Sequence, residues 1–143
     1  MNAVMFITFQ MLGFGIDGGG ILMNPAIQSD KVIQVWDVLE PLPLVVTRPV
    51  PILVGIFLFG IAHAYFYRSF RLAWRAGVAW RGLALASLVF VMTFLFWEFF
   101  TPFNLFGEPL PLIALELAFW TLIALADGFA IAAVMERGLS RPS

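Results

Sequence analysis

The sequence predicts an all-α integral membrane protein with four transmembrane helices in an up-and-down bundle. Hydrophobic residues make up 62% of the 143-residue chain and charged residues only 12%, which leaves too little polar surface to solvate a globule of this size. Mean hydropathy is +0.95. The apolar residues also fall in runs of about 20, the length that crosses a bilayer as a helix. We therefore expect a single membrane domain over residues 1–143.

Composition excludes several classes of site. The chain has no cysteine, so disulfides, thiol catalysis and Cys-ligated metal centres are excluded. Its formal net charge is -1, and it contains no basic block of the kind that binds phosphate backbones. No hydrolase, kinase or zinc-protease motif is present. We expect no nucleic-acid partner, no metal site and no catalytic residues. The sequence leaves open whether the protein is an enzyme and favours a non-enzymatic role.

The first predicted span covers residues 3–23 and is rich in glycine. Gln10 and Asp17 interrupt its apolar run, and no positive segment precedes it, so it does not match a secretory signal peptide. Gly15 and Gly19 give the small-xxx-small spacing at which membrane helices approach closely. The sequence leaves open whether this span crosses the membrane completely.

A short interfacial helix is predicted at about residues 30–40, in the first outer loop. Ser29 is a suitable N-cap, and Pro41 must end the helix. The apolar positions recur at helical spacing, and Trp36 is expected at the level of the lipid headgroups. An ordered loop is the alternative, because isolated helices of this length are marginally stable.

The second predicted span covers residues 50–70, contains His63 and leads into an arginine-rich loop. Half of the 8 lysines and arginines of the chain lie around this loop. By the positive-inside rule the loop is cytoplasmic, which places both termini of a four-span protein on the cytoplasmic side. The arginines concerned are Arg68, Arg71, Arg75 and Arg81. The aromatic residues expected as anchors at the membrane–water interfaces are Trp36, Tyr65, Tyr67, Trp74 and Trp80.

The third and fourth predicted spans cover about residues 79–101 and 109–135. Pro102 is expected to end the third helix near Thr101, because proline lacks a backbone donor and clashes with the preceding turn. Glu108 is expected at or near the N-cap of the fourth helix, where its charge meets the positive end of the helix dipole. The short link predicts that these two helices are antiparallel neighbours.

Five ionisable residues fall inside the predicted spans, where charge is costly and such side chains usually face the bundle interior. We therefore predict a buried polar cluster made of Asp17, His63, Glu98, Glu116 and Asp127. Glu116 and Asp127 share one helix face, about 16 Å apart along the axis. Both His63 and Asp127 are expected in the cytoplasmic half of the membrane, so we predict a contact between them.

Each of these residues has a purely structural alternative. Glu98 could meet water at the outer headgroup level, and Asp17 could bind backbone donors where a glycine-rich helix frays. Glu116 and Asp127 could be neutral carboxylic acids hydrogen-bonded to a neighbouring helix. His63 could be a hydrogen-bonded core residue, since a single histidine supplies only one axial ligand.

Three functions follow as hypotheses. The favoured one is a non-enzymatic accessory or assembly subunit that packs against other membrane proteins, because small residues occur on every span. The second is a proton-coupled carrier or channel that uses Glu116 and Asp127. The third is a pigment- or haem-binding subunit with His63 as ligand, although no cofactor is assigned. The expected surroundings are the lipid bilayer of a bacterial inner membrane, with other membrane proteins or a second copy as partner.

Overall fold

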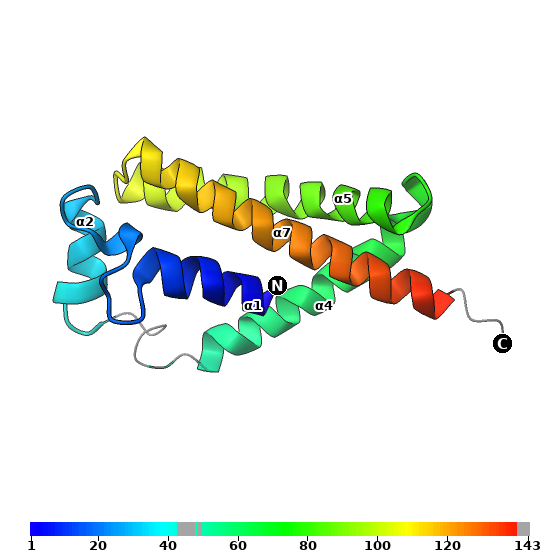
Figure 1. Cartoon of the computed structure of the whole chain (residues 1–143), viewed down its shortest axis with the longest axis horizontal. Helices are drawn as coiled ribbons and strands as arrows, with labels where there is room; N and C mark the ends of the chain where they lie inside the picture. The colour runs from blue at the N-terminus through cyan, green and yellow to red at the C-terminus, as the bar shows by residue number, and fades with distance from the viewer. Residues whose placement is uncertain (43–47, 49, 140–143) are drawn as a thin grey trace.

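The computed structural model describes residues 1–42, 48 and 50–139, and Figure 1 shows how they are arranged. The described residues form helices and turns, without a strand. Within these described residues, three helical rods are long and apolar enough to cross a membrane: Val50–Ala73, Val78–Leu105 and Leu110–Gly138. The predicted all-helical class is therefore confirmed.

The N-terminal helix is shorter than the predicted span 3–23. It consists of α1 (Asn2–Met5) and π-helical turns over Phe6–Phe14. At 1.5 Å per residue this rod is about 20 Å long, less than the roughly 30 Å of a bilayer core. The chain then turns at Gly15 and Gly18, whose φ angles are 78° and 79°, a conformation open to glycine. The helix of the predicted span 3–23 therefore ends at Phe14, which answers the question that the sequence leaves open, and its glycines form a turn.

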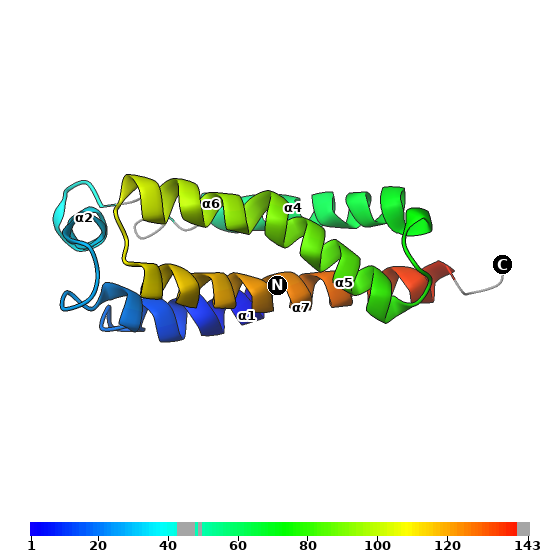
Figure 2. The same ribbon diagram turned by 90° about the horizontal axis from the view of Figure 1, so that it is seen from above.

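Short helical segments close one end of the bundle. A single 3₁₀ turn, Ile21–Met23, precedes α2 (Asp30–Ile33), which continues as π-helical turns over Gln34–Val38. The Ser29 side chain accepts a hydrogen bond from the backbone N–H of Val32 at 3.4 Å, as predicted for an N-cap. Figure 2 shows α2 lying across the end of the rods.

The helix α4 (Val50–Phe70) is the least covered of the long helices. A 3₁₀ turn, Arg71–Ala73, continues it. Only 11% of its most apolar stretch is buried inside the chain, against 28% and 33% for the other two rods. The buried residues of α4 are His63 and Tyr67, so α4 contacts the rest of the chain along one narrow face.

The next rod runs through the predicted end of the third span. It comprises α5 (Val78–Val89), π-helical turns over Phe90–Leu95, α6 (Phe96–Glu98) and further π-helical turns over Phe99–Leu105. The expectation that Pro102 ends this helix is therefore wrong. In an α-helix the proline ring meets the carbonyl four residues earlier. The wider π-helical turns move that carbonyl away, and the helix continues.

The last helix, α7 (Leu110–Leu139), packs against α5 through small residues. A Cβ atom added to Gly128 would lie 2.4 Å from the carbonyl oxygen of Gly82 and 2.9 Å from the backbone nitrogen of Ala86. Only glycine permits so close a crossing. The α5–α7 pair is therefore the rigid centre of the fold, and α1 and α4 pack on it.

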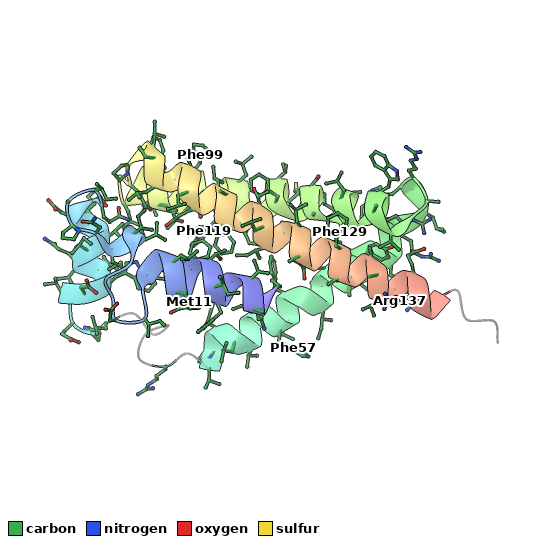
Figure 3. All side chains as sticks on the ribbon, viewed as in Figure 1. Met11, Phe57, Phe99, Phe119, Phe129 and Arg137 are labelled. Carbon is green, nitrogen blue, oxygen red and sulfur yellow. The ribbon has the colours of Figure 1, made fainter. Side chains whose placement is uncertain are left out.

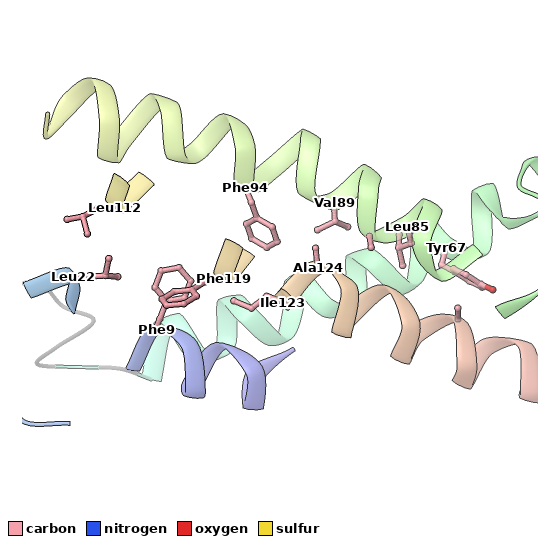
Figure 4. Close-up of a cluster of buried hydrophobic side chains, with 12 residues drawn as sticks. Phe9, Leu22, Tyr67, Leu85, Val89, Phe94, Leu112, Phe119, Ile123 and Ala124 are labelled. Carbon is pink, nitrogen blue, oxygen red and sulfur yellow. The ribbon is translucent and has the colours of Figure 1, made fainter. Parts of the chain in front are cut away.

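A line of buried apolar side chains fills the space between the rods (Figure 4). The rings of Phe94 and Trp120 are stacked with centroids 4.3 Å apart. The ring of Phe9 meets Phe119 edge-on at 5.4 Å. This aromatic core joins the π-helical turns Phe6–Phe14 to α7 and to the rod that begins with α5.

Candidate functional site: two buried polar pairs

The predicted five-residue cluster is divided in the structure. Four of the five residues are buried, whereas Asp17 is exposed. The Asp17 carboxylate accepts a hydrogen bond from the backbone N–H of Gly19 at 3.3 Å, within the turn that follows the short first helix. The prediction that Asp17 belongs to the buried cluster is wrong, because the helix expected to carry it inward ends at Phe14. The buried residues are His63, Glu98, Glu116 and Asp127.

His63 on α4 and Asp127 on α7 form the first pair. His63 Nδ1 lies 2.5 Å from Asp127 Oδ2, and the two residues are 3% and 7% exposed. This is the contact that their predicted depths imply. At 1.5 Å per residue, His63 lies about 2 Å from the midpoint of the rod Val50–Ala73, and Asp127 lies about 5 Å from the midpoint of the rod Leu110–Gly138. The pair therefore lies near the centre of the membrane-spanning region, where an unpaired charge is most costly.

Tyr67 and Glu136 form a second polar contact between α4 and α7. The fully buried Tyr67 hydroxyl donates to Glu136 Oε1 at 2.8 Å. Glu136 also accepts from Arg81 Nη1 at 2.7 Å and from Arg71 Nη1 at 3.4 Å. Both buried residues of α4 thus bind carboxylates of α7. The sequence does not predict this role for Glu136, because a glutamate near a helix end is usually solvated.

The predicted interface anchors have different surroundings. Tyr65 and Trp80 are exposed, and the Arg75 guanidinium lies 4.6 Å from the centre of the Trp80 ring. Trp36 and Trp74 are half-buried. The assignment of Tyr67 as an anchor is wrong, because its hydroxyl is used inside the bundle.

Glu98 and Glu116 form the second buried pair. The Trp120 indole N–H donates to Glu98 Oε1, and the Glu116 carboxyl lies next to the Glu98 carboxyl. Glu98 Oε2 is buried and has no hydrogen-bond partner in the described part of the chain. Glu98 is only 1% exposed, so it does not meet water at the helix end.

Glu108 and Gln28 close the end of the bundle that carries α2. The Gln28 side-chain amide donates to Glu108 Oε1 and, at 2.9 Å, to the carbonyl oxygen of Leu22. Burial raises the pKa of Glu108, and the nearby Glu98 carboxyl adds to this rise, while the Gln28 hydrogen bond opposes it. Glu108 precedes α7 by two residues, near the N-terminal end of the helix as predicted, and its carboxylate binds Gln28.

A cleft of about 370 Å³ adjoins the His63–Asp127 pair. Its volume falls in the range of small-ligand sites, and its walls are apolar except for Asp127 and Asn2. A Cβ atom added to Gly60 would meet nothing within 4 Å, so this glycine leaves open space on α4. The lining residues are Met1, Asn2, Ile56, Phe57, Gly60, Ile61, Ala64 and Asp127.

The chemistry that these side chains offer is proton binding and hydrogen bonding. Within the described ranges, no group of three or more His, Asp or Glu side chains is placed to hold a metal ion. Asp127 occupies His63 Nδ1, so His63 Nε2 is the ring nitrogen left for another ligand. Aromatic rings lie between the two buried pairs. The Phe59 ring is 4.1 Å from the His63 ring and 6.4 Å from the Phe94 ring, which stacks on Trp120.

Comparison with known proteins gives no relative: no family model matches the chain, and neither a curated protein nor a solved structure is detectably similar to it. Function is therefore inferred from the geometry of these side chains.

Proposed function

We propose that this chain is a non-enzymatic accessory or assembly subunit that binds another membrane protein through α4. The observation that carries the proposal is the incomplete packing of this helix. His63 and Tyr67 are its only buried residues, and both are held by hydrogen bonds. Large apolar side chains cover its other faces, and the spaces beside its glycines are empty.

The partner we propose is a transmembrane helix of another protein, seated in the cleft beside Gly60 and Ala64. These residues are four positions apart, so both small side chains lie on one face of α4. This spacing lets a second helix backbone approach closely, and close packing is a main source of helix association in lipid. A binding site for a small molecule would need more polar groups than this cleft provides.

The arrangement in the membrane is part of the proposal. We place the chain in a bacterial inner membrane with the arginine-rich loop and the end of α7 on the cytoplasmic side. The short helix α2 and Glu108 then lie at the outer surface. The N-terminal helix over residues 2–14 is too short to cross the membrane, so we place it in the outer half. This proposal has three spans and does not retain the predicted fourth span or the cytoplasmic N-terminus.

Site-specific photo-crosslinking in native membranes tests this function. Phe57 and Phe99 are both exposed phenylalanines, on opposite sides of the chain (Figure 3). A photoreactive phenylalanine analogue at Phe57 should give a discrete crosslinked protein band, and the same analogue at Phe99 should give none. Crosslinks to lipid alone from both positions would contradict the proposal. A band at twice the mass of the chain would identify a second copy as the partner.

The two buried pairs favour a second candidate, a proton-coupled carrier or channel that uses Glu116 and Asp127. Asp127 is hydrogen-bonded to His63 of α4, and Glu116 lies beside the Glu98 carboxyl of α6. Proton gain or loss at either site would therefore change a contact between helices. The aromatic core between the sites would have to move to join them, and for this reason we prefer the subunit function.

Proton flux into liposomes distinguishes the second candidate from the first. A carrier should acidify a dye-loaded vesicle, and Glu116→Gln or Asp127→Asn should abolish the flux. Asp37→Asn, a change at an exposed residue of the α2 region, is the matched control. Flux that is absent in the unmodified protein, or equal in all variants, would exclude this candidate.

A third candidate, a haem or pigment at His63, is favoured by the carboxylate on Nδ1, since metal-bound histidines usually donate their other N–H to such a group. The visible absorption spectrum of the protein purified from native membranes tests it. A colourless protein would exclude this candidate.

A further inference from the structure

Four arginines lie on or next to the turn that joins α4 to α5, at the end of the bundle opposite α2 (Figure 1). Arg68 lies in the last turn of α4, and Arg71 lies in the 3₁₀ turn that follows. Arg75 lies in the link before α5, and Arg81 lies in the first turn of α5. The link is short, so all four arginines lie at the same end of the bundle.

The carboxylate of Glu136 neutralises only part of this charge. It binds Arg71 and Arg81, while Arg68 and Arg75 are exposed. Four cations therefore face one anion in this cluster. The surplus of positive charge lies beside an apolar surface, where basic side chains attract anionic lipid headgroups.

One buried donor in the cluster lacks an acceptor. Arg81 is 8% exposed, and its Nε–H has no hydrogen-bond partner in the part of the chain that the structure describes. A buried guanidinium N–H without an acceptor is costly. An oxygen atom from outside the chain would satisfy it, and phosphate oxygens suit guanidinium donors best.

Two tryptophans indicate the depth of the cluster. Trp80 is half-exposed beside Arg75, and Trp74 is half-buried next to Tyr67, with ring centroids 6.1 Å apart. Tryptophan is enriched at the level of the lipid headgroups. The phosphate groups of the bilayer lie at this same level.

From these observations we infer that the cluster of Arg68, Arg71, Arg75 and Arg81 is a binding site for the phosphate of an anionic phospholipid. The net positive charge favours a lipid without a cationic headgroup, such as phosphatidylglycerol, over phosphatidylcholine. Arg68 and Arg75 attract the headgroup, and Arg81 Nε offers the buried donor. This site is independent of the proposed partner of α4.

Native mass spectrometry of the purified full chain, with phosphatidylglycerol or phosphatidylcholine added, tests the site. The double variant Arg68→Ala, Arg75→Ala should bind phosphatidylglycerol roughly 25-fold more weakly, about fivefold for each arginine. Both side chains lie outside the Glu136 contacts, so folding should be preserved. Lys31→Ala, which removes an exposed cation at the other end, should bind as the unmodified chain does.

A second measurement separates a lipid from a free phosphate. Inorganic phosphate at millimolar concentration should not displace phosphatidylglycerol, whose acyl chains contribute to binding, whereas raised salt should weaken binding. Equal binding of the two lipids would overturn the inference, as would unchanged affinity in the double variant or an equal loss in Lys31→Ala. Displacement by inorganic phosphate would show an anion site that is not specific for lipid, and would also overturn it.

Discussion

His63 Nδ1 of α4 and Asp127 Oδ2 of α7 lie 2.5 Å apart, near the midpoints of two rods that are long and apolar enough to cross a membrane. Four residues further along α4, Tyr67 binds Glu136 of α7. These two contacts hold α4 to α7. His63 and Tyr67 are the only residues of α4 that are buried against the rest of the described chain. The α5–α7 contact is different in kind, since it is made by the close crossing of glycines.

A double-mutant cycle should show that His63 and Asp127 stabilise the fold together. His63→Leu or Asp127→Leu alone leaves a buried polar partner unpaired and should lower the free energy of unfolding by about 1–3 kcal/mol. The double variant should lose less than the sum, with a coupling of about 1 kcal/mol. Reversible unfolding in mixed micelles measures these values. Additive losses within about 0.5 kcal/mol would show that the contact contributes nothing.

Tyr67→Phe removes one hydroxyl and nothing else. Because this hydroxyl donates to Glu136 inside the bundle, its loss should cost about 1 kcal/mol of unfolding free energy. Tyr65→Phe is the matched control, because Tyr65 is 69% exposed and should change little. Equal stabilities of the two variants in the same micelle assay would argue against the Tyr67–Glu136 contact.

Gly128→Ala should disturb the crossing of α5 and α7. The new Cβ would lie 2.4 Å from the carbonyl oxygen of Gly82, so the helices must move apart, at a cost of about 1–3 kcal/mol. Gly60→Ala places the same group in open space and should leave stability unchanged or raise it slightly. Thermal unfolding of the two variants compares them directly, and an unaffected Gly128→Ala would disprove the close approach.

The Glu108→Gln variant should reveal the effect of burial on that carboxyl. Its pKa is raised by burial in the folded protein, so the protonated form stabilises the fold. This contribution is complete below the ordinary carboxyl pKa of about 4.3 and is lost as the pH rises through the folded value. The unmodified chain should therefore lose stability relative to Glu108→Gln as the pH increases. A difference in melting temperature that stays constant from pH 4 to pH 9 would contradict this expectation.

The contact between His63 and Asp127 can be predicted from the positions of the two residues within their predicted spans. Both residues lie well inside long apolar runs that form helices. The position of each residue in its helix then gives its depth in the membrane. The buried position predicted for Asp17 is wrong, because five nearby glycines end the helix before this residue. The small-residue spacing of the same glycines is also typical of a packed membrane helix. Pro102 was misjudged because π-helical turns accommodate proline where α-helical turns do not.

No local sequence pattern predicts the other polar contacts, which are Gln28–Glu108 and the contacts of Glu136. Gln28 and Glu108 are brought together only when α2 closes the bundle end, which depends on tertiary packing. Glu136 and Arg81 could have been paired as opposite charges at one level of two antiparallel helices. Their link to Tyr67 requires knowing which face of α4 is buried, and the nearly uniform apolarity of α4 hides that face.

The most direct test of the proposed function is the recovery of a partner with two glycine variants of α4. Gly60→Leu and Gly55→Leu each add a side chain where the fold leaves open space, but only Gly60 lines the cleft. We predict that the partner crosslinked from Phe57 co-purifies with the unmodified chain and with Gly55→Leu, and is lost with Gly60→Leu, while all three melt at similar temperatures. Equal recovery with both variants would contradict the claim that α4 binds its partner through this cleft.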